Sequence, residues 1–354
     1  MSIPTEPIGS LPRPRALQDA LADHAAGRLS AAELKKLQDQ AVVDTLARLE
    51  QTGSPLLVDG DQAKPDTITY PVQGLTGLAR DGVVIPYADG HTRQLPRLTT
   101  GPFRYQVRAD TYLRAALKHT ERPVKQAVVA PSALSLLYPA DGIAGYSREA
   151  FLSDLANESE AEIRACLDAG AHRVQLDFTE GRLALKLDPS GGVLDDFITL
   201  NNKVLGRFSE KERNRLGVHT SPGADYDSTH SLDVDYAELL LRLFQLKVGN
   251  FYLQLASEPD PERVLKTAAD QLRPGIRVFV GVTDPLDPTV ETPEEVRDRV
   301  LLAANHIPAD QLGTCDDDGF APYADDTSTS REVAFAKIEA RIRGTEIASR
   351  DLGM

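Results

Sequence analysis

The feature that most constrains this chain is the recurrence of short apolar, β-rich runs separated by stretches with helical spacing. The run 277–283 is typical, because its apolar residues follow one another without strict alternation, as in parallel strands covered on both faces. Strands that alternate with helices form right-handed βαβ units, and eight such units close into a barrel. We predict eight strands, at 55–60, 96–103, 124–131, 173–178, 215–221, 250–255, 277–284 and 311–316.

Helix start signals separate the predicted strands. Ser30 with Glu33, for example, forms a capping box ahead of an apolar helical face. No glycine-rich dinucleotide turn follows the first strand, which disfavours the alternative of an open doubly wound sheet. We therefore predict an α/β protein with one (β/α)8 TIM barrel domain over residues 1–354. Residues 1–54 form an N-terminal extension in this prediction, and 179–192 form an excursion that covers the active-site face.

The charge balance excludes two classes of partner. The chain has 53 Asp plus Glu against 39 Lys plus Arg, a formal net charge of -14, so neither nucleic acid nor an anionic membrane surface is an expected partner. Its start lacks a secretion signal, no apolar run reaches membrane-spanning length, and two cysteines are too few for a disulfide framework. We expect a cytoplasmic protein and leave open whether it forms a homodimer.

Carboxylates are concentrated at the predicted strand ends. In a β/α barrel, polar residues at the carboxyl end of a strand point into the active site. Aspartate also caps helices, so any one of these residues has a purely structural alternative, but four acidic strand ends together favour a functional site. The acids are Asp59 and Asp61 after the first strand, Asp177 and Glu180 at the fourth, Asp284 at the seventh, and Asp316, Asp317 and Asp318 at the eighth.

Further polar residues are predicted to lie at the same face. Of seven histidines, His219 alone ends a predicted strand ahead of a glycine-containing loop, although a lone histidine also serves as a buried core residue. The sixth strand end carries Gln254 and Glu258. Near the amino terminus, the turn around Ser10 offers backbone N–H groups that suit a carboxylate.

The two cysteines differ in their expected roles. Cys166 lies on the apolar face of a predicted helix, which indicates a core residue. Cys315 belongs to the last predicted strand, and the sequence leaves open whether it faces the barrel interior or the helices.

These strand-end signatures, in this order, resemble the catalytic carboxyl-terminal barrel of cobalamin-independent methionine synthase. The resemblance runs from Ile8 to near the end of the chain, while the second barrel of the full-length synthase is absent. The segments that carry it are Ile8-Gly-Ser-Leu-Pro-Arg-Pro14, Val58-Asp-Gly-Asp61, Gln175-Leu-Asp177, Gly217-Val-His-Thr220 and Gly281-Val-Thr-Asp-Pro285.

The resemblance implies a zinc-dependent methyl transfer, but this chain departs from the family's ligand pattern. In the family, zinc held by His-x-Cys, a carboxylate and a later Cys binds homocysteine as a thiolate, which attacks a methyl group on a folate or corrinoid donor. His219 matches the histidine ligand, whereas Ser221, Gln254 and Asp318 stand at the other positions. Cys315 is three residues too early to restore the set. We therefore expect an altered or absent zinc site, with His219 and Asp318 as the remaining metal ligands or as a proton-transfer pair.

The resemblance also implies a pocket for an amino-acid-like substrate. The turn at Ser10 would receive its carboxylate, and Asp61 and Asp177 would hold its ammonium group. The methyl donor stays unassigned, because the chain has no tryptophan to stack a pterin. The predicted catalytic residues are His219, Asp177 and Asp318, and the predicted substrate-binding residues are Ser10, Asp61, Asp177, Gln254 and Glu258.

Two other functions are compatible with such a barrel. The first is a metal-independent lyase or decarboxylase, as in the related uroporphyrinogen decarboxylase barrel, although no arginine cluster suited to a polycarboxylate is found at the strand ends. The second is a non-catalytic paralog that only binds an amino acid. Turnover of a methyl donor distinguishes a transferase from both.

Overall fold

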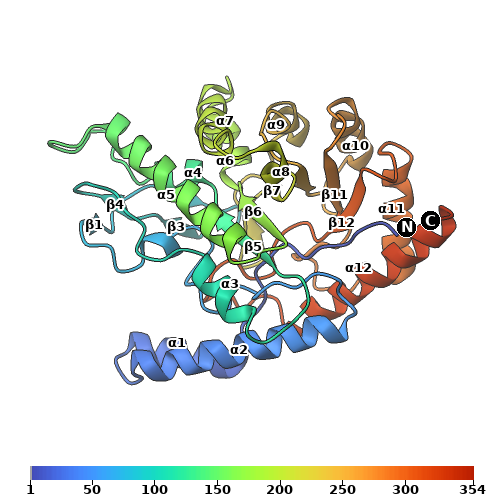
Figure 1. The fold of residues 1–354 in the computed structure, drawn as a ribbon, viewed down its shortest axis with the longest axis horizontal. Helices are drawn as coiled ribbons and strands as arrows, with labels where there is room; N and C mark the ends of the chain where they lie inside the picture. The colour runs from blue at the N-terminus through green and yellow to red at the C-terminus, as the bar shows by residue number, and fades with distance from the viewer. Residues whose placement is uncertain (1) are drawn as a thin grey trace.

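The computed structural model describes residues 2–354 and is built around a six-stranded parallel sheet (Figure 1). Every residue of its strands is buried except at the ends of two of them, which explains the continuous apolar runs in the sequence. In sheet order the strands are β12 (Leu312–Cys315), β11 (Arg277–Gly281), β10 (Asn250–Leu253), β7 (Leu216–Thr220), β6 (Arg173–Asp177) and β5 (Lys125–Val129).

Each edge of this sheet is extended by one more parallel segment, which gives eight positions in all. Leu57 bridges to Val124 beside β5, and Thr5 bridges to Thr314 beside β12. The two added segments meet where the Leu11 N–H donates to the Gly60 carbonyl at 3.0 Å. The prediction of a TIM barrel-like α/β fold is confirmed, and residues near Thr5, which we had placed outside the repeat, belong to it.

The strand predicted at 96–103 is wrong as a barrel strand. In this region β4 (Arg97–Leu98) pairs antiparallel with β1 (Leu78–Ala79), outside the parallel sheet. Pro96 and Pro102 flank it, and neither has the N–H that a central strand donates to its neighbour, so the run is too short for a barrel position.

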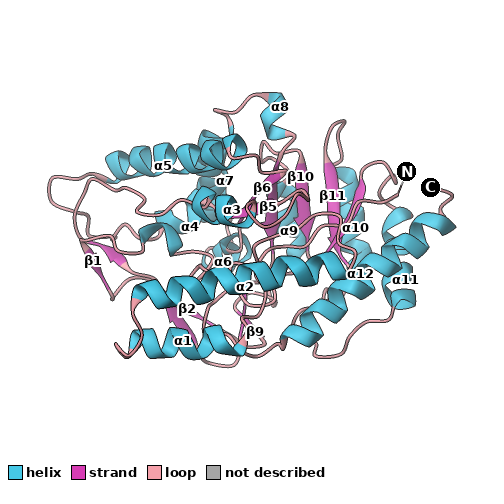
Figure 2. Ribbon diagram, turned by 60° about the horizontal axis from the view of Figure 1, so that its bottom comes forward, coloured by secondary structure: helices cyan, strands magenta, loops and turns pink. Residues whose placement is uncertain are grey.

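Helices pack around the outside of the sheet, as Figure 2 shows. The capping box predicted from Ser30 and Glu33 is present and starts α2. None of the helices in residues 2–354 has the length and apolar character that crossing a membrane requires. The longer helices are α1 (Arg15–Ala25), α2 (Ala31–Gln51), α5 (Arg148–Asp168), α7 (Gly192–Leu205), α10 (Pro261–Asp270), α11 (Pro293–Ala304) and α12 (Arg331–Asp351), and the shorter ones are α3 (Asp110–Ala116), α4 (Pro131–Ser135), α6 (Glu180–Leu187), α8 (Glu210–Arg213) and α9 (Tyr236–Leu243).

Two small hairpins lie beside each other over the carboxyl ends of the strands. The first joins β2 (Val84–Pro86) to β3 (Thr92–Gln94), and the second joins β8 (Ala224–Asp225) to β9 (Ser228–Thr229). Arg93 links them, because its guanidinium contacts both carboxylate oxygens of the buried Asp225. The excursion predicted at 179–192 contains α6.

The barrel interior has its own apolar cluster, separate from the layer between sheet and helices. Tyr252 and Phe279 stack there with ring centroids 4.7 Å apart, and Ile8 and Cys315 complete the cluster. Cys315 is fully buried, and burial raises the pKa of its thiol well above the ordinary value. Cys166 is fully buried on α5, which confirms that it is a core residue.

Candidate active site

A pocket opens at the carboxyl ends of the strands and contains four of the predicted site residues. Asp177 and His219 come from the neighbouring strands β6 and β7, which pair at this position, Asp318 follows β12, and Ser10 belongs to the amino-terminal turn. These residues lie far apart in the sequence, so parallel strand packing is what brings them together. The apolar part of the wall comes from Ile8, Ile68, Ile85, Leu95, Ala133, Leu136 and Leu183.

His219 is buried between two carboxylates. Its Nδ1 lies 3.5 Å from Asp177 Oδ1, and its Nε2 lies 3.9 Å from Asp318 Oδ1. Nε2 also lies 3.3 Å from the Asp317 carbonyl, and because a carbonyl only accepts, Nε2 is the nitrogen that carries hydrogen. Burial lowers the pKa of His219, but the two carboxylates outweigh burial, so the pKa lies above its ordinary value. The two carboxylates therefore stabilise the protonated form of the imidazole.

Asp318 is held against the amino-terminal turn. Its Oδ1 accepts a hydrogen bond from the Gly319 N–H at 2.7 Å, while Oδ2 is buried without a hydrogen-bond partner among residues 2–354. Burial raises the pKa of Asp318, and the charge of His219 opposes that effect. A Cβ at Gly319 would lie 2.1 Å from Ser10 Oγ, so glycine is required there for the two segments to pack.

The turn at Ser10 presents unused donors to the pocket. Its carbonyl accepts from the Phe320 N–H at 2.9 Å, which fixes the turn against the loop after β12. Neither the Gly9 nor the Ser10 N–H donates a hydrogen bond within the described chain. Two backbone donors at a pocket wall are suited to a carboxylate.

Asp61 is placed behind the pocket wall instead of in it. Its carboxylate is 1% exposed and lies 2.8 Å from the equally buried Lys64 ammonium. Asp61 Oδ2 would lie 3.9 Å from a Cβ at Gly9, so the carboxylate supports the turn from its far side. Asp61 therefore lies next to Gly9 without itself lining the pocket.

Gln254 and Glu258 also lie apart from the lining residues. Both accept hydrogen bonds from Arg182 Nη1, at 2.9 and 2.6 Å, which uses an acceptor oxygen of each that was predicted for a substrate. The buried Arg182 requires such hydrogen-bond partners. Gln254 and Glu258 follow it by 72 and 76 residues, so the sequence gives no sign of the pairing.

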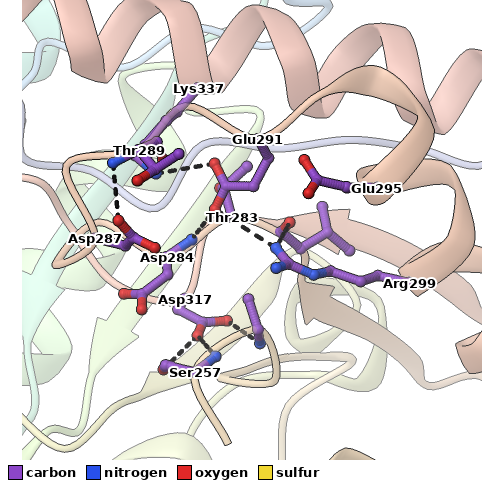
Figure 3. Close-up of polar contacts among 12 residues, drawn as sticks. Ser257, Thr283, Asp284, Asp287, Thr289, Glu291, Glu295, Arg299, Asp317 and Lys337 are labelled. Carbon is purple, nitrogen blue, oxygen red and sulfur yellow. Dashed lines mark hydrogen bonds and ion pairs between the residues drawn. The ribbon is translucent and has the colours of Figure 1, made fainter.

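Most of the other strand-end carboxylates stabilise loops. Asp317 accepts four hydrogen bonds of 2.6 to 2.9 Å from the Leu255, Ala256 and Ser257 N–H groups and the Ser257 hydroxyl (Figure 3). The Asp284 N–H donates to Glu291 Oε1 at 2.8 Å in the same view, and the Asp284 carboxylate accepts from the Leu286 N–H at 3.0 Å. These two carboxylates therefore have a structural role in loops, and neither caps a helix as the structural alternative proposed.

Four ionisable lining residues were not predicted as site residues. Burial raises the pKa of Glu180 to about 8, so its carboxyl is protonated at neutral pH. Burial, with nearby Lys186 and Arg182, lowers the pKa of His230 to about 3, which leaves its imidazole neutral. Tyr87 packs edge-on against His230, with ring centroids 5.6 Å apart. Glu180 belongs to the acidic end of the fourth predicted strand but was given no site role, whereas the hairpin residues carried no strand-end signal. The fourth is Tyr323.

A family model described as the catalytic domain of cobalamin-independent synthase matches residues 3–331. The chain belongs to this family. Curated proteins named methionine synthase from Sulfurisphaera tokodaii and Saccharolobus solfataricus are each 23% identical to it, over 99% of this chain and 94% and 96% of theirs. The match makes the chain a methyltransferase-family enzyme.

Solved structures show the same fold. A B12-independent methionine synthase from Shewanella, solved in complex with selenomethionine, superposes with a TM-score of 0.78 at 22% identity, over 99% of both chains. The B12-independent methionine synthase described as putative from Listeria monocytogenes gives 0.71 at 19% identity. The fold of these structures therefore covers 99% of this chain.

The zinc that the synthase family uses does not fit the residues present here. Ser221 is buried and accepts from the Gly223 N–H, and Gln254 is held by Arg182. Cys315 lies in the apolar barrel interior, with its thiol protonated. Among residues 2–354, no three His, Cys, Asp or Glu side chains are grouped as metal ligands, so His219 and Asp318 have no thiolate partner.

Proposed function

We propose that this enzyme binds the α-amino and α-carboxyl groups of an amino-acid-like substrate in the pocket between Asp177 and the turn at Ser10. The observation that carries the proposal is that a carboxylate and two unused backbone donors line one pocket. An ammonium group pairs with Asp177, and a carboxylate with the N–H groups of Gly9 and Ser10. The selenomethionine bound by the Shewanella structure is a ligand of this class.

We further propose that His219 and Asp318 transfer a proton in place of the family's zinc chemistry. In its neutral form, His219 accepts a proton from the substrate nucleophile, and the two carboxylates beside it stabilise the imidazolium that forms. The nucleophile then attacks an alkyl group of the donor, and the rest of the donor leaves with the electron pair of the broken bond. Asp318 Oδ2 has no partner within the described chain, which leaves it able to accept a hydrogen bond from the same nucleophile. The nucleophile and the methyl donor are outside this proposal.

The lining residues disfavour the decarboxylase alternative. None of the lining residues that the structure describes is Arg or Lys, and a substrate with several carboxylates requires such cations. The protonated Glu180 and the neutral His230 add no positive charge.

Calorimetric titration with L-methionine tests the binding proposal. Asp177→Asn should weaken binding at least tenfold, because a charge-assisted hydrogen bond contributes about 1.5 to 3 kcal/mol. Asp284→Asn, at a strand end outside the pocket, is the matched control and should bind as the parent does. Equal affinity in all three proteins would refute the pocket.

Metal analysis and methyl transfer assays test the second proposal. Protein purified without added metal should lose any zinc on dialysis, and His219→Ala should remove transfer while its melting temperature stays close to that of the parent. Binding without turnover by the parent would identify a non-catalytic paralog. Stoichiometric zinc that resists dialysis, with methyl transfer to homocysteine, would contradict the proton-transfer pair.

A further inference from the structure

We propose that Gln175 is a positioning residue for Asp177, and that Lys125 fixes Gln175 in the orientation this requires. The three side chains form a continuous chain through the barrel interior and end at the pocket. Lys125 Nζ donates to Gln175 Oε1 at 2.6 Å, and Gln175 Nε2 donates to Asp177 Oδ1 at 2.8 Å. This inference rests on the proposed role of Asp177 in holding the substrate ammonium.

Strand geometry places these groups on one face. Residues two apart in a strand point the same way, so Gln175 and Asp177 on β6 share the interior side. Lys125 lies on the adjacent strand β5, where it pairs directly with Arg173. Lys125 and Gln175 are both fully buried, so no water competes for their hydrogen bonds.

Lys125 determines which way the Gln175 amide faces. An ammonium group only donates, so the amide atom that contacts it must be oxygen. The amide nitrogen then points toward Asp177, where it donates. Without Lys125 the amide is free to rotate by half a turn, which would place its oxygen against the Asp177 carboxylate and repel it.

An ion pair with Glu6 does not by itself explain why Lys125 is buried in the barrel interior. Glu6 already pairs with Arg173 at 3.0 Å and accepts a hydrogen bond from the Tyr252 hydroxyl at 2.5 Å, whereas Lys125 lies 3.9 Å away. Burying an ammonium group is costly, and its shortest contact is with Gln175. Lys125 is therefore positioned to hold the side-chain amide of Gln175.

This series of hydrogen bonds from Lys125 through Gln175 leaves one Asp177 oxygen for the substrate. Oδ1 accepts from Gln175 and faces His219 Nδ1 at 3.5 Å, so it is engaged on both sides. Oδ2 is consequently the oxygen available to an ammonium group. A carboxylate held at one oxygen loses its freedom to rotate, which lowers the entropy that binding must remove.

Two ligands that differ only at the ammonium group test this assignment. L-methionine is compared with its α-hydroxy analogue, 2-hydroxy-4-(methylthio)butanoate, in titrations of the parent, Gln175→Met and Gln126→Met. Gln126 is an equally buried glutamine on β5 that donates to the Ala127 carbonyl and is the matched control. Gln175→Met should weaken L-methionine binding about tenfold and leave the hydroxy acid within about twofold, while Gln126→Met changes neither. Equal losses for both ligands, or no loss, would overturn the proposal.

A mutant cycle in the ligand-free protein separates this inference from the proposed function. If Gln175 holds Asp177, the fall in melting temperature of the Gln175→Met, Asp177→Asn double variant is smaller than the two single falls combined. Additive falls would overturn the assignment even if the parent bound no amino acid. Lys125→Met is a second variant, expected to show the same ligand-selective loss in smaller size, should Gln175→Met fold poorly.

Discussion

The Asp317 carboxylate allows a quantitative test of how the active-site loops are held. Each of its oxygens accepts two hydrogen bonds from the loop after β10 (Figure 3). In Asp317→Asn, one oxygen becomes an NH2 group that faces two donors, either Leu255 and Ala256 or Ser257 twice. Leaving two buried donors unpaired costs about 1 to 3 kcal/mol each, and easier burial of a neutral amide offsets part of this. We expect a net loss of about 3 kcal/mol in the free energy of unfolding.

Thermal unfolding measures this loss directly. An unfolding entropy of about 2.1 cal/mol/K per residue gives about 0.74 kcal/mol/K for a chain of 354 residues, so the melting temperature should fall by about 4 °C. Ser257→Ala removes a single hydroxyl donor and should lower it by about 1 °C. A melting temperature for Asp317→Asn equal to that of the parent, or equal falls for both variants, would show that the carboxylate does not hold the loop.

Three further predictions concern buried ionisable groups and the core. Lys64→Met should lower the free energy of unfolding, measured by urea titration, by about 3 to 5 kcal/mol because it leaves the Asp61 carboxylate buried and unpaired. Lys35→Met, at an exposed ion pair, is the control and should change it by less than about 1 kcal/mol. The pKa of Glu180 is raised to about 8 in the folded state, so Glu180 keeps a proton that the unfolded chain releases near pH 4.5. The free energy of unfolding therefore falls as pH rises between these two values. Glu180→Gln should remove that part of the slope of melting temperature against pH. Cys166→Ser should cost about 1 to 2 kcal/mol by burying a hydroxyl in the core, without changing ligand affinity, and a loss of binding in this variant would contradict its assignment to the core.

Local sequence patterns predicted the parallel strands of the barrel well, because buried apolar residues recur in each of them, although β5 and β6 also bury polar side chains such as Lys125 and Gln175. They failed for the segment near Thr5, whose neighbours in space are Thr314 and the rest of β12. A single parallel bridge produces no apolar repeat and no turn signal, so nothing local distinguishes it from a loop. The short β4 was mistaken for a barrel strand because composition alone does not show the limit set by its flanking prolines.

The candidate site was predicted where side chains lie directly at strand ends. Asp177, His219 and Asp318 line the pocket because strand direction alone determines where they point. Asp61, Gln254 and Glu258 are engaged by Lys64 and Arg182, and a sequence does not show which buried cation will pair with which acid. The hairpin residues that complete the wall were missed for a similar reason, since loops cover a barrel in ways that strand patterns do not encode.

Closure of the barrel by its amino-terminal segment has a consequence for synthesis on the ribosome. The Glu6 carbonyl accepts a hydrogen bond from Arg341, 335 residues further along the chain. At roughly 5 to 20 residues per second, the partner emerges about 15 to 70 s after Glu6 does. The turn at Ser10 follows Glu6 closely in the chain, so the pocket wall that would receive a carboxylate also forms late. A nascent chain therefore lacks this wall until Phe320, whose N–H donates to the Ser10 carbonyl, has also been made.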